Sequence, residues 1–422
     1  MRENLSETSI KILYWDNLLC NIEFNMSNEI PESFKNLKII DPDEKIVYCK
    51  KCVISNQRPR VHFNEDGICG QCLYAKYKQT KIDWDKREKE LESLCDKFRS
   101  RDGSWDVIVP ASGGKDSSYV AYILKEKFDM HPLTVTWASA VPTDVGSQNL
   151  YNFIQSGYDN ILVSPNGKIH SKLSKLTFTE YGENFLPFSY GQVHVPLHIA
   201  VKFKIPLIMY GENGELEYGG SLKNYNKPQL DVFGHDYVLE KFAPSSNPTD
   251  PNRWQNNGFS DKDLVFYMPP PVQDLKDVGI QEHYYSYYED WTPEKHYEIA
   301  KKHFKFLPNP AGRSEGTYTD FASLDDKTDG FHYYLMFIKF GIGRATSDAA
   351  HQIRQNMITR DEGVDLVLKY DGEYPSFYEK EFLNYMKMDK TVLNQIIDKF
   401  RRSLIWKKDG ENWNLRQQVS KL

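Results

Sequence analysis

The stretch Trp105-Asp106-Val107-Ile108-Val109-Pro110 leads directly into Ala111-Ser112-Gly113-Gly114-Lys115-Asp116-Ser117, and a helical pattern follows. Residues 106–110 predict a short buried strand, and apolar residues recur at helical spacing from Val120 to Phe128. A Ser/Gly loop between a strand and a helix N-terminus offers free N–H groups and the positive end of the helix dipole. The two glycines let the backbone approach a ligand closely, and Lys115 adds a positive charge. The stretch therefore predicts a phosphate-binding loop.

The loop is not a Walker A motif, which needs four residues between its first glycine and Gly-Lys. The residues S-G-G-K-D-S at 112–117 resemble the PP-loop of the N-type ATP pyrophosphatases, which cleave ATP between the α and β phosphates. The alternative is an ordinary glycine-rich turn, but the flanking strand and helix favour nucleotide binding. The resemblance implies ATP and Mg²⁺, with the phosphates held by Ser112, Gly113, Gly114, Lys115, Asp116 and Ser117.

Strand and helix patterns alternate through residues 105–220. Strands are expected at 106–110, 132–137, 160–163 and 206–210, and helices at 117–128, 146–156, 168–181 and 193–203. This alternation predicts an α/β fold, in which helices cover both faces of a parallel sheet. Ligands of such sheets bind at the carboxyl ends of the strands, where the loop lies.

The whole chain divides into four regions. We expect an N-terminal extension (1–47), a zinc-ribbon-like module (48–80), a PP-loop domain (81–220, opening with a connecting helix at 81–104) and a mostly helical, substrate-binding C-terminal region (221–422). Within the last region, 263–268 predicts a strand stopped by three prolines. Thr292-Pro293 predicts a helix start, with Thr292 as N-cap.

Four cysteines stand in two pairs, Cys49-x-x-Cys52 and Cys69-x-x-Cys72, separated by a predicted strand and turn. This spacing can place four thiolates tetrahedrally around Zn²⁺. Two disulfides or a redox-active pair are the alternatives, and His62 is a competing ligand candidate. A four-thiolate site has no open position, so its expected role is structural. Cys20 and Cys95 are expected to be bystanders.

Composition limits the class of protein. The 422 residues are 40% hydrophobic and 27% charged, and the formal net charge is −6. The chain lacks the basic excess that is typical of nucleic-acid-binding proteins, so we expect no nucleic acid partner. No apolar run is long enough for a membrane span, and no signal-peptide core is present at the N-terminus, so we expect a cytoplasmic protein.

PP-loop enzymes activate either a carbonyl oxygen for attack by ammonia or an amine, or a tRNA base for attack by sulfur. The sulfur class typically needs nucleophilic cysteines near the nucleotide, and residues 105–422 contain none. A tRNA-modifying enzyme stays the alternative, and a zinc-bearing module that binds nucleotide without turnover is a third, non-enzymatic possibility.

Several further motifs occur in a fixed order along the chain. They are Cys49–Cys52, Gly67–Cys72, the loop at 112–117, Gly211-Glu212-Asn213-Gly214-Glu215, Glu315–Thr319, Ser323–Lys327, Lys339–Thr346, Ile353-Arg354 and Tyr370–Pro375. Together they resemble the N-acetyl sugar amidotransferase family of bacterial surface-polysaccharide and flagellar glycan synthesis. The resemblance runs from Tyr48 to about Pro375 and leaves residues 1–47 unexplained.

The resemblance implies conversion of an acetamido group to an acetamidino group. ATP would adenylate the oxygen of an N-acetyl amino sugar, and ammonia would displace AMP. Ammonia would come from a separate glutaminase, similar to the pair used in histidine biosynthesis, because this chain offers no glutaminase cysteine after Cys95.

Roles follow for individual residues. The expected catalytic residues are Lys115, Asp116 and Glu212. Asp116 could instead orient the loop or Mg²⁺ or be structural. Glu212 would bind Mg²⁺ or accept a proton from ammonia, with a charged loop turn as the alternative. Adenine is expected near Thr136 and Trp137, with Gly211 at the same sheet edge; core packing is the alternative for Trp137. The substrate, expected to be nucleotide-linked or acidic, would contact Asn213, Asp325, Asp326, Lys339, Arg344 and Arg354, although helix capping and solvated surface are alternatives for the charged members. His194 and His198 have a metal-binding spacing, but a helix packed on the sheet explains them better.

Overall fold

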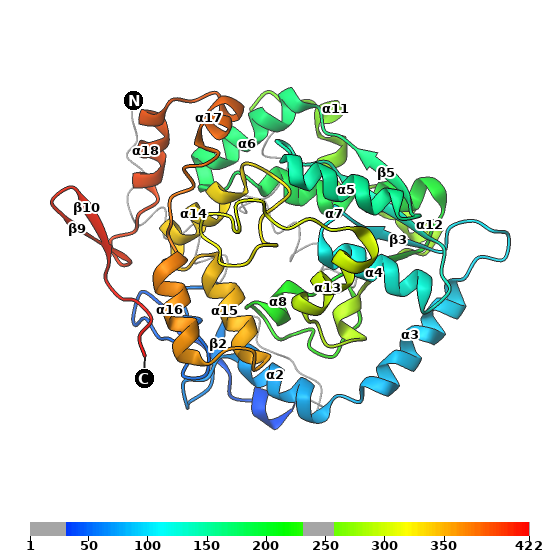
Figure 1. The fold of residues 1–422 in the computed structure, drawn as a ribbon, viewed down its shortest axis with the longest axis horizontal. Helices are drawn as coiled ribbons and strands as arrows, with labels where there is room; N and C mark the ends of the chain where they lie inside the picture. Colours follow the sequence, from blue (N-terminus) through cyan, green and yellow to red (C-terminus); the bar gives the residue numbers. More distant parts are fainter. Residues whose placement is uncertain (1–30, 231–256, 422) are drawn as a thin grey trace.

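A six-stranded sheet is the centre of the protein in the computed structural model, which describes residues 31–230 and 257–421 (Figure 1). The strands lie in the order β5-β4-β3-β6-β8-β7. The first five are parallel, and β7 is antiparallel to β8. Their bounds are β3 Val107–Pro110, β4 Pro132–Trp137, β5 Asp159–Val163, β6 Leu207–Tyr210, β7 Gln229–Leu230 and β8 Gln281–Tyr284. The expected parallel α/β sheet is confirmed.

Helices cover both faces of the sheet because alternate side chains of each strand point to opposite faces. In β3, Val107 and Val109 join the core under α3, α4 and α13, whereas Ile108 joins the core under α7 and α12. The helices of this layer structure are α3 Trp84–Phe98, α4 Lys115–Glu126, α5 Asp144–Gln155, α6 Gly167–Tyr181, α7 Leu186–Phe203, α12 Val272–Val278 and α13 Pro293–Phe304. Thr292 stands at the N-cap of α13 as expected, but its hydroxyl donates to the Asp290 carbonyl instead of capping the helix.

Three elements differ from the sequence expectation. The helix expected at 193–203 begins seven residues earlier, since α7 is Leu186–Phe203 with Pro187 in its first turn. The strand expected at 263–268 is wrong, because Ser260 and Asp263 form a capping box that starts helix α11 (Asp261–Leu264), and the 3-10 turn η3 (Val265–Tyr267) follows. The sheet also continues past residue 220, since β8 pairs with β6. The polar residues Glu282 and His283 hide this strand in the sequence, although both are buried.

The cysteine module packs with the segment before it. β1 (Lys38–Ile39) pairs with β2 (His62–Phe63), and the 3-10 turn η2 (Glu32–Phe34) contacts α2 (Gly70–Lys81). Residues 38–39 therefore extend the module. Cys20 lies outside the described residues.

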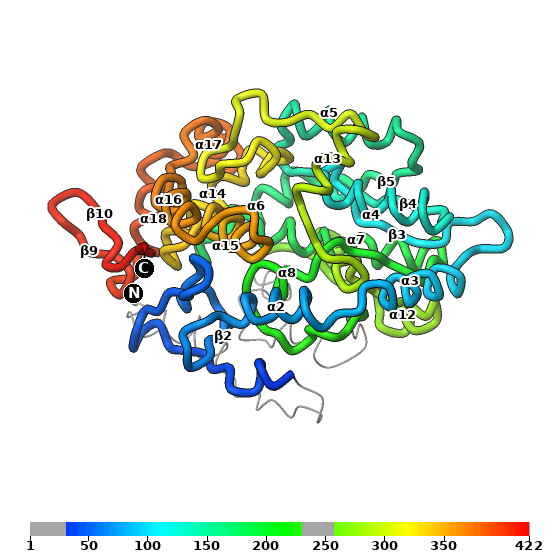
Figure 2. The backbone as a smooth tube through the Cα atoms, turned by 60° about the horizontal axis from the view of Figure 1, so that its bottom comes forward, coloured from blue at the N-terminus to red at the C-terminus, as the bar shows by residue number. Residues whose placement is uncertain are grey.

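The C-terminal region is mostly helical. It contains α14 Asp329–Phe340, α15 Arg344–Arg354, α16 Arg360–Tyr370, α17 Glu379–Met386, α18 Lys390–Lys399 and the hairpin β9 Trp406–Asp409 with β10 Asn412–Leu415. Figure 2 shows α15 and α16 beside the cysteine module, and Ala349, Ala350 and Val364 share one core with three of the cysteines. None of the helices in the described part of the chain combines the length and apolar character of a membrane span.

Candidate functional site

The Ser/Gly loop lies between β3 and the first turn of α4, as the sequence predicts. Gly114 is the N-cap and has no side chain to fill the first turn of the helix, so the amides there can meet an anion. Gly113 has φ +81°, and a Cβ there would lie 2.4 Å from the Cα of Leu150. Only glycine therefore lets the loop pass this close to α5. Ser112 accepts from the Gly114 amide at 3.3 Å, and Ser117 donates to the Gly114 carbonyl at 3.3 Å.

Lys115 and Asp116 form an ion pair that a histidine from α13 completes. Lys115 Nζ lies 2.5 Å from Asp116 Oδ2, and His296 Nδ1 lies 2.8 Å from Asp116 Oδ1. Burial opposes the charge on Asp116, but Lys115 and His296 outweigh it and hold the pKa of this carboxyl below its ordinary range. Burial also lowers the pKa of His296, so the neutral ring donates its Nδ1 proton to Asp116.

His296 is a site residue that the sequence analysis missed. It is 1% exposed, stacks on the Tyr119 ring at 4.2 Å and meets the Trp291 ring edge-on at 4.3 Å. Tyr119 and Trp291 therefore fix the orientation of the ring. A histidine 180 residues from its carboxylate partner gives no local signal.

Glu212 follows β6 on the same sheet edge. Burial and the nearby Asp116 charge raise its pKa to about 7. Gly211 packs against Trp291, because a Cβ at this position would lie 2.8 Å from the indole ring. The carboxyls of Asp116 and Glu212 are thus neighbours whose pKa values are pushed in opposite directions, which is typical of sites that move protons.

Asn213 does not point out to a ligand. It is buried, its Oδ1 accepts from the Glu215 amide at 3.1 Å, and its own amide donates to Ser286. It therefore caps the short helix α8 (Gly214–Glu217).

The two aspartates after Leu324 have different roles. Asp325 reaches the loop, where its side chain hydrogen-bonds Ser112, and burial raises its pKa to about 6. Asp326 is buried and accepts from the amides of Val141 and Thr328, so it shapes the turn before α14, whose N-cap is Thr328.

Thr136 and Trp137 lie at the end of β4, but both are buried. Thr136 donates to the Ala111 carbonyl at 2.6 Å. Trp137 packs edge-on against Tyr267 and fills the space over Gly191, where no Cβ would fit. The geometry agrees with the core alternative for Trp137. His194 is buried on α7, and His198 contacts the carbonyls of Val265 and Met268, so both pack the helix onto its neighbours.

A second group of charged and polar residues comes from α14, α15 and the turn before α7. We call it the distal cluster: Glu183, Asp329, His332, Tyr333, Arg344 and Asp348. His332 Nδ1 lies 2.6 Å from Glu183, and Arg344 donates to Asp348 at 2.9 Å and to the Tyr333 hydroxyl at 2.5 Å. Burial disfavours a charged imidazole, but Glu183 outweighs it and raises the pKa of His332. Lys339 is buried, with its Nζ 3.8 Å from Glu183.

The distal cluster lies close to the loop site. Tyr218 feels the charges of Glu212 and Asp116 as well as those of Arg344 and Asp348, so it lies between the two groups. Sequence reasoning identified Arg344 and Lys339 but missed Glu183 and His332, which become neighbours only through the packing of α14.

Arg354 is not part of this cluster. It is buried at the end of α15, donates from Nη2 to the Glu217 carbonyl at 2.5 Å, and feels the charges of Cys52, Cys69 and Cys72. Arg354 stands ten residues after Arg344, nearly three helical turns along α15, so it lies at the cysteine module and away from the residues that were expected to share the same substrate group.

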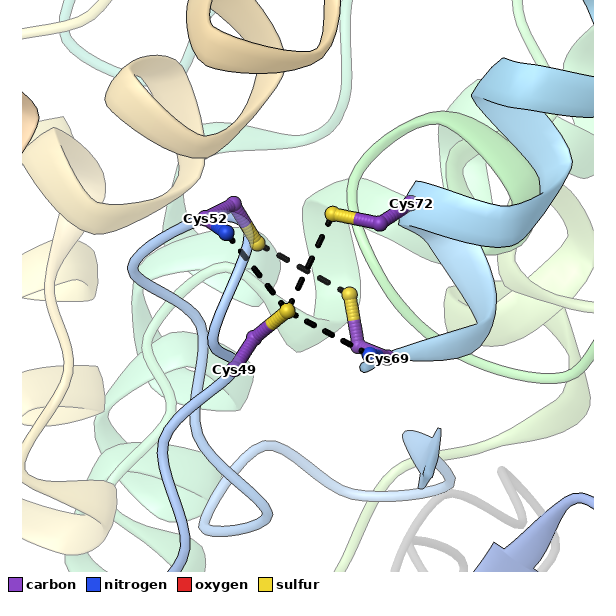
Figure 3. A group of neighbouring side chains, drawn as sticks. All are labelled: Cys49, Cys52, Cys69 and Cys72. Carbon is purple, nitrogen blue, oxygen red and sulfur yellow. Dashed lines mark hydrogen bonds between the residues drawn. The ribbon is translucent and has the colours of Figure 1, made fainter. Parts of the chain in front are cut away.

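The four cysteines converge as their spacing predicts (Figure 3). All four Sγ atoms lie within 4.8 Å of one another, with 3.8 Å between Cys49 and Cys72 and 3.7 Å between Cys52 and Cys69. The amides of Lys51 and Cys69 each lie 3.3 Å from Cys49 Sγ, where they favour a thiolate. The four cysteines can therefore hold a metal ion, and His62 is outside this group. Cys95 is buried in the core beneath α3.

Residues 315–420 match a family described as "LPS biosynthesis protein WbpG-like, C-terminal domain". For the part of the chain that it covers, this match confirms the expected resemblance to proteins of bacterial surface-glycan synthesis. An uncharacterized protein of Methanocaldococcus jannaschii is 34% identical over 90 residues, which are 21% of this chain and 31% of that protein. The match thus spans about a third of the length of this relative.

Solved structures with similar segments have low TM-scores. The U34-tRNA thiolase NcsA of Methanococcus maripaludis, with its [4Fe-4S] cluster, is 14% identical, with 82% of this chain and 99% of that chain covered and a TM-score of 0.27. The NH3-dependent NAD synthetase of Campylobacter jejuni is 15% identical, covers 47% of this chain and 93% of its own, and has a TM-score of 0.24.

Proposed function

We propose, from the premise that residues 315–420 carry a WbpG-like C-terminal domain of lipopolysaccharide biosynthesis, that this protein is an ATP-dependent N-acetyl sugar amidotransferase. It would turn the acetamido group of an amino sugar into an acetamidino group. The observation that carries the proposal is the pairing of the phosphate loop with Glu212, a carboxyl whose pKa lies near neutrality beside the charged Asp116.

The loop supports adenylation. Lys115 pairs with Asp116 until phosphates arrive, and its Nζ can then offset the charge that develops on pyrophosphate. His296 keeps the Asp116 carboxylate in place during this exchange. Mg²⁺ would arrive with ATP, and Asp116 is the carboxylate of the loop that would face it.

The chemistry needs two steps. The amide oxygen attacks the α-phosphorus of ATP, pyrophosphate leaves, and the amide N–H proton is released, which gives an O-adenylated imidate. Ammonia then adds to the imidate carbon and loses a proton, and AMP leaves with the former amide oxygen. Glu212 suits the second step, because a base with a pKa of about 7 is partly ionised at neutral pH and can take the proton from the added ammonia.

The distal cluster supports recognition of the sugar. Its carboxylates, its imidazole and Arg344 offer hydrogen-bond donors and acceptors to hydroxyl groups, and Arg344 can pair with a phosphate or a carboxylate of the substrate. A glutaminase partner would supply the ammonia, since all six cysteines precede the loop and none is available downstream.

The cysteine module fits Zn²⁺. A tetrahedron with Zn–S bonds of about 2.3 Å has sulfur–sulfur edges of about 3.8 Å. The separations of 3.7 and 3.8 Å agree with these edges. A four-iron cubane sets its thiolates farther apart, because iron and sulfide lie between them. A bound zinc would cross-link the two cysteine pairs and leave no position open for chemistry.

An enzymatic assay for AMP and the acetamidino product tests the proposal. Purified protein is incubated with ATP, an ammonium salt and a panel of free and nucleotide-linked N-acetyl sugars. We expect AMP and a product lighter by the difference between O and NH. Absence of AMP with every acetamido sugar, together with AMP on addition of tRNA, would replace the proposal with the tRNA-modifying alternative.

A further inference from the structure

A buried ion-pair cluster lies between the cysteine module and the loop site, and the reaction proposed above does not use it. Its centre is Glu217 in α8, whose side chain is 3% exposed. Lys78 Nζ lies 2.9 and 3.1 Å from the two carboxylate oxygens, and His351 Nε2 lies 3.5 Å from one of them. Lys78 also lies 2.8 Å from Asp290. Burial opposes ionisation of Glu217, but Lys78 outweighs it and lowers the pKa to about 2.

The cluster joins three segments that are far apart in sequence. Lys78 comes from α2, whose first turn contains Cys72. Glu217 comes from α8, five residues after Glu212, and His351 comes from α15, which begins at Arg344. Figures 1 and 2 both show α2, α8 and α15 side by side. One buried ion-pair cluster therefore connects a metal-holding helix to the segments that carry two of the proposed site residues.

Further hydrogen bonds, donated by Gln71 and Arg58, reinforce the same connection. Gln71, adjacent to Cys72, donates to the carbonyls of Glu215 at 3.0 Å and Gly220 at 2.9 Å. Arg58 donates to the Gly219 carbonyl at 3.0 Å and to Ser347 of α15 at 3.1 Å. The segment 213–220 is thus held by side chains of the cysteine module on its main-chain carbonyls.

We propose that the cysteine module positions the loop site and Glu212. Lys78 and Glu217 are the positioning residues, because their buried ion pair ties the module to the segment behind Glu212. A metal ion held by the four cysteines would fix the start of α2. Through Lys78 and Gln71, α2 fixes the segment behind Glu212, and through Glu217 and His351 it fixes α15. A buried ion pair suits this task better than apolar contacts, because only one arrangement satisfies both charges. The catalytic role of Glu212 rests on the proposed function. The coupling between the cysteine module and residues 213–220 does not depend on it.

The experiment uses Lys78→Met in the full-length, metal-loaded protein, with Lys81→Met as the matched control. Lys81 is an exposed residue of the same helix, three positions away. Amide hydrogen exchange is measured for the whole chain, followed by metal content, kcat and the KM for ATP. We expect exchange in residues 213–220 to accelerate roughly tenfold or more, because removing one partner leaves Glu217 buried and less compensated.

Exchange in β3 and β4 should stay unchanged, with one metal retained. We also expect kcat to fall about tenfold and the KM for ATP to stay within about twofold, since the ion pairs of Lys78 are to Glu217 and Asp290 and not to the Ser112–Ser117 loop. The control should match the parent in every readout. If Lys78→Met does not fold, the same measurements are made on Glu217→Gln, which keeps the shape of the side chain.

Unchanged exchange in 213–220 with metal retained would overturn the coupling, whatever the activity. Faster exchange spread evenly over the chain would also overturn it, because that is plain destabilisation. If the unsubstituted protein forms no AMP with any sugar, the proposed function fails, and the exchange result still decides the coupling.

Discussion

The loop site and the Glu217 cluster contain the same kinds of residue, yet their charges are arranged differently. At Glu217 every charge has a close partner of opposite sign, and the pKa of the carboxyl is lowered to about 2. At the loop, Lys115 and His296 both contact Asp116. Glu212 is half-buried beside the negative charge of Asp116, and its pKa is raised to about 7. A satisfied cluster holds structure, whereas a site that leaves one carboxyl uncompensated can exchange a proton or bind a cation.

The largest expected effect on the loop site comes from substitution of Lys115. We expect Lys115→Ala to lower AMP formation by roughly 10²- to 10³-fold, because one positive charge at the transferring phosphates is lost. The fold should remain, since Lys115 ends at a half-buried carboxylate and not in the apolar core. Rates are measured as AMP released by chromatography. Lys125→Ala on the same helix is the control, and an equal loss there would contradict a specific role for Lys115.

On the structural side, Cys69→Ser should remove the metal and lower the Tm by on the order of 10 °C, because a four-ligand site loses a ligand that is fully buried. Metal content by elemental analysis and Tm by calorimetry check this. Cys95→Ala, a buried cysteine outside the cluster, should keep its metal. Full metal content in Cys69→Ser would show that the cysteines are not the site.

The smallest expected effect is the pH dependence of stability at Glu212, whose pKa is raised whereas that of Glu217 is lowered. With a folded pKa of about 7 against an ordinary 4.5, protonated Glu212 favours the fold. The stability that it contributes is full below about pH 4.5 and is lost as the pH rises to about 7.

Glu212→Gln cannot ionise, so its Tm should exceed that of the parent by roughly 2 to 4 °C more at pH 8 than at pH 5. The acidic limb of the kcat profile near pH 7 should disappear in the same variant, with a lower plateau. The exposed Glu298→Gln of α13 serves as control. A Tm difference that does not change with pH would mean that Glu212 is not a shifted carboxyl.

The elements around the loop could be predicted from the sequence because their signals are local. β3, α4, β4, α5, β5, α6 and β6 lie where apolar periodicity placed them, and the spacing of the two cysteine pairs predicted the four-cysteine cluster. β8 could not be predicted, since Glu282 and His283 are polar and become buried only beside β6.

The sequence by itself determined the Ser/Gly loop before α4, the parallel sheet and the four-cysteine cluster, since each shows in local patterns and short spacings. Only the tertiary structure decided the partners of these features. It brought His296 to Asp116, Asp325 to Ser112 and Lys78 to Glu217, and it moved Arg354 from the expected substrate group to the cysteine module. The physical reason is that a buried charge is stable only where packing supplies its counter-charge, and packing here joins residues more than a hundred positions apart.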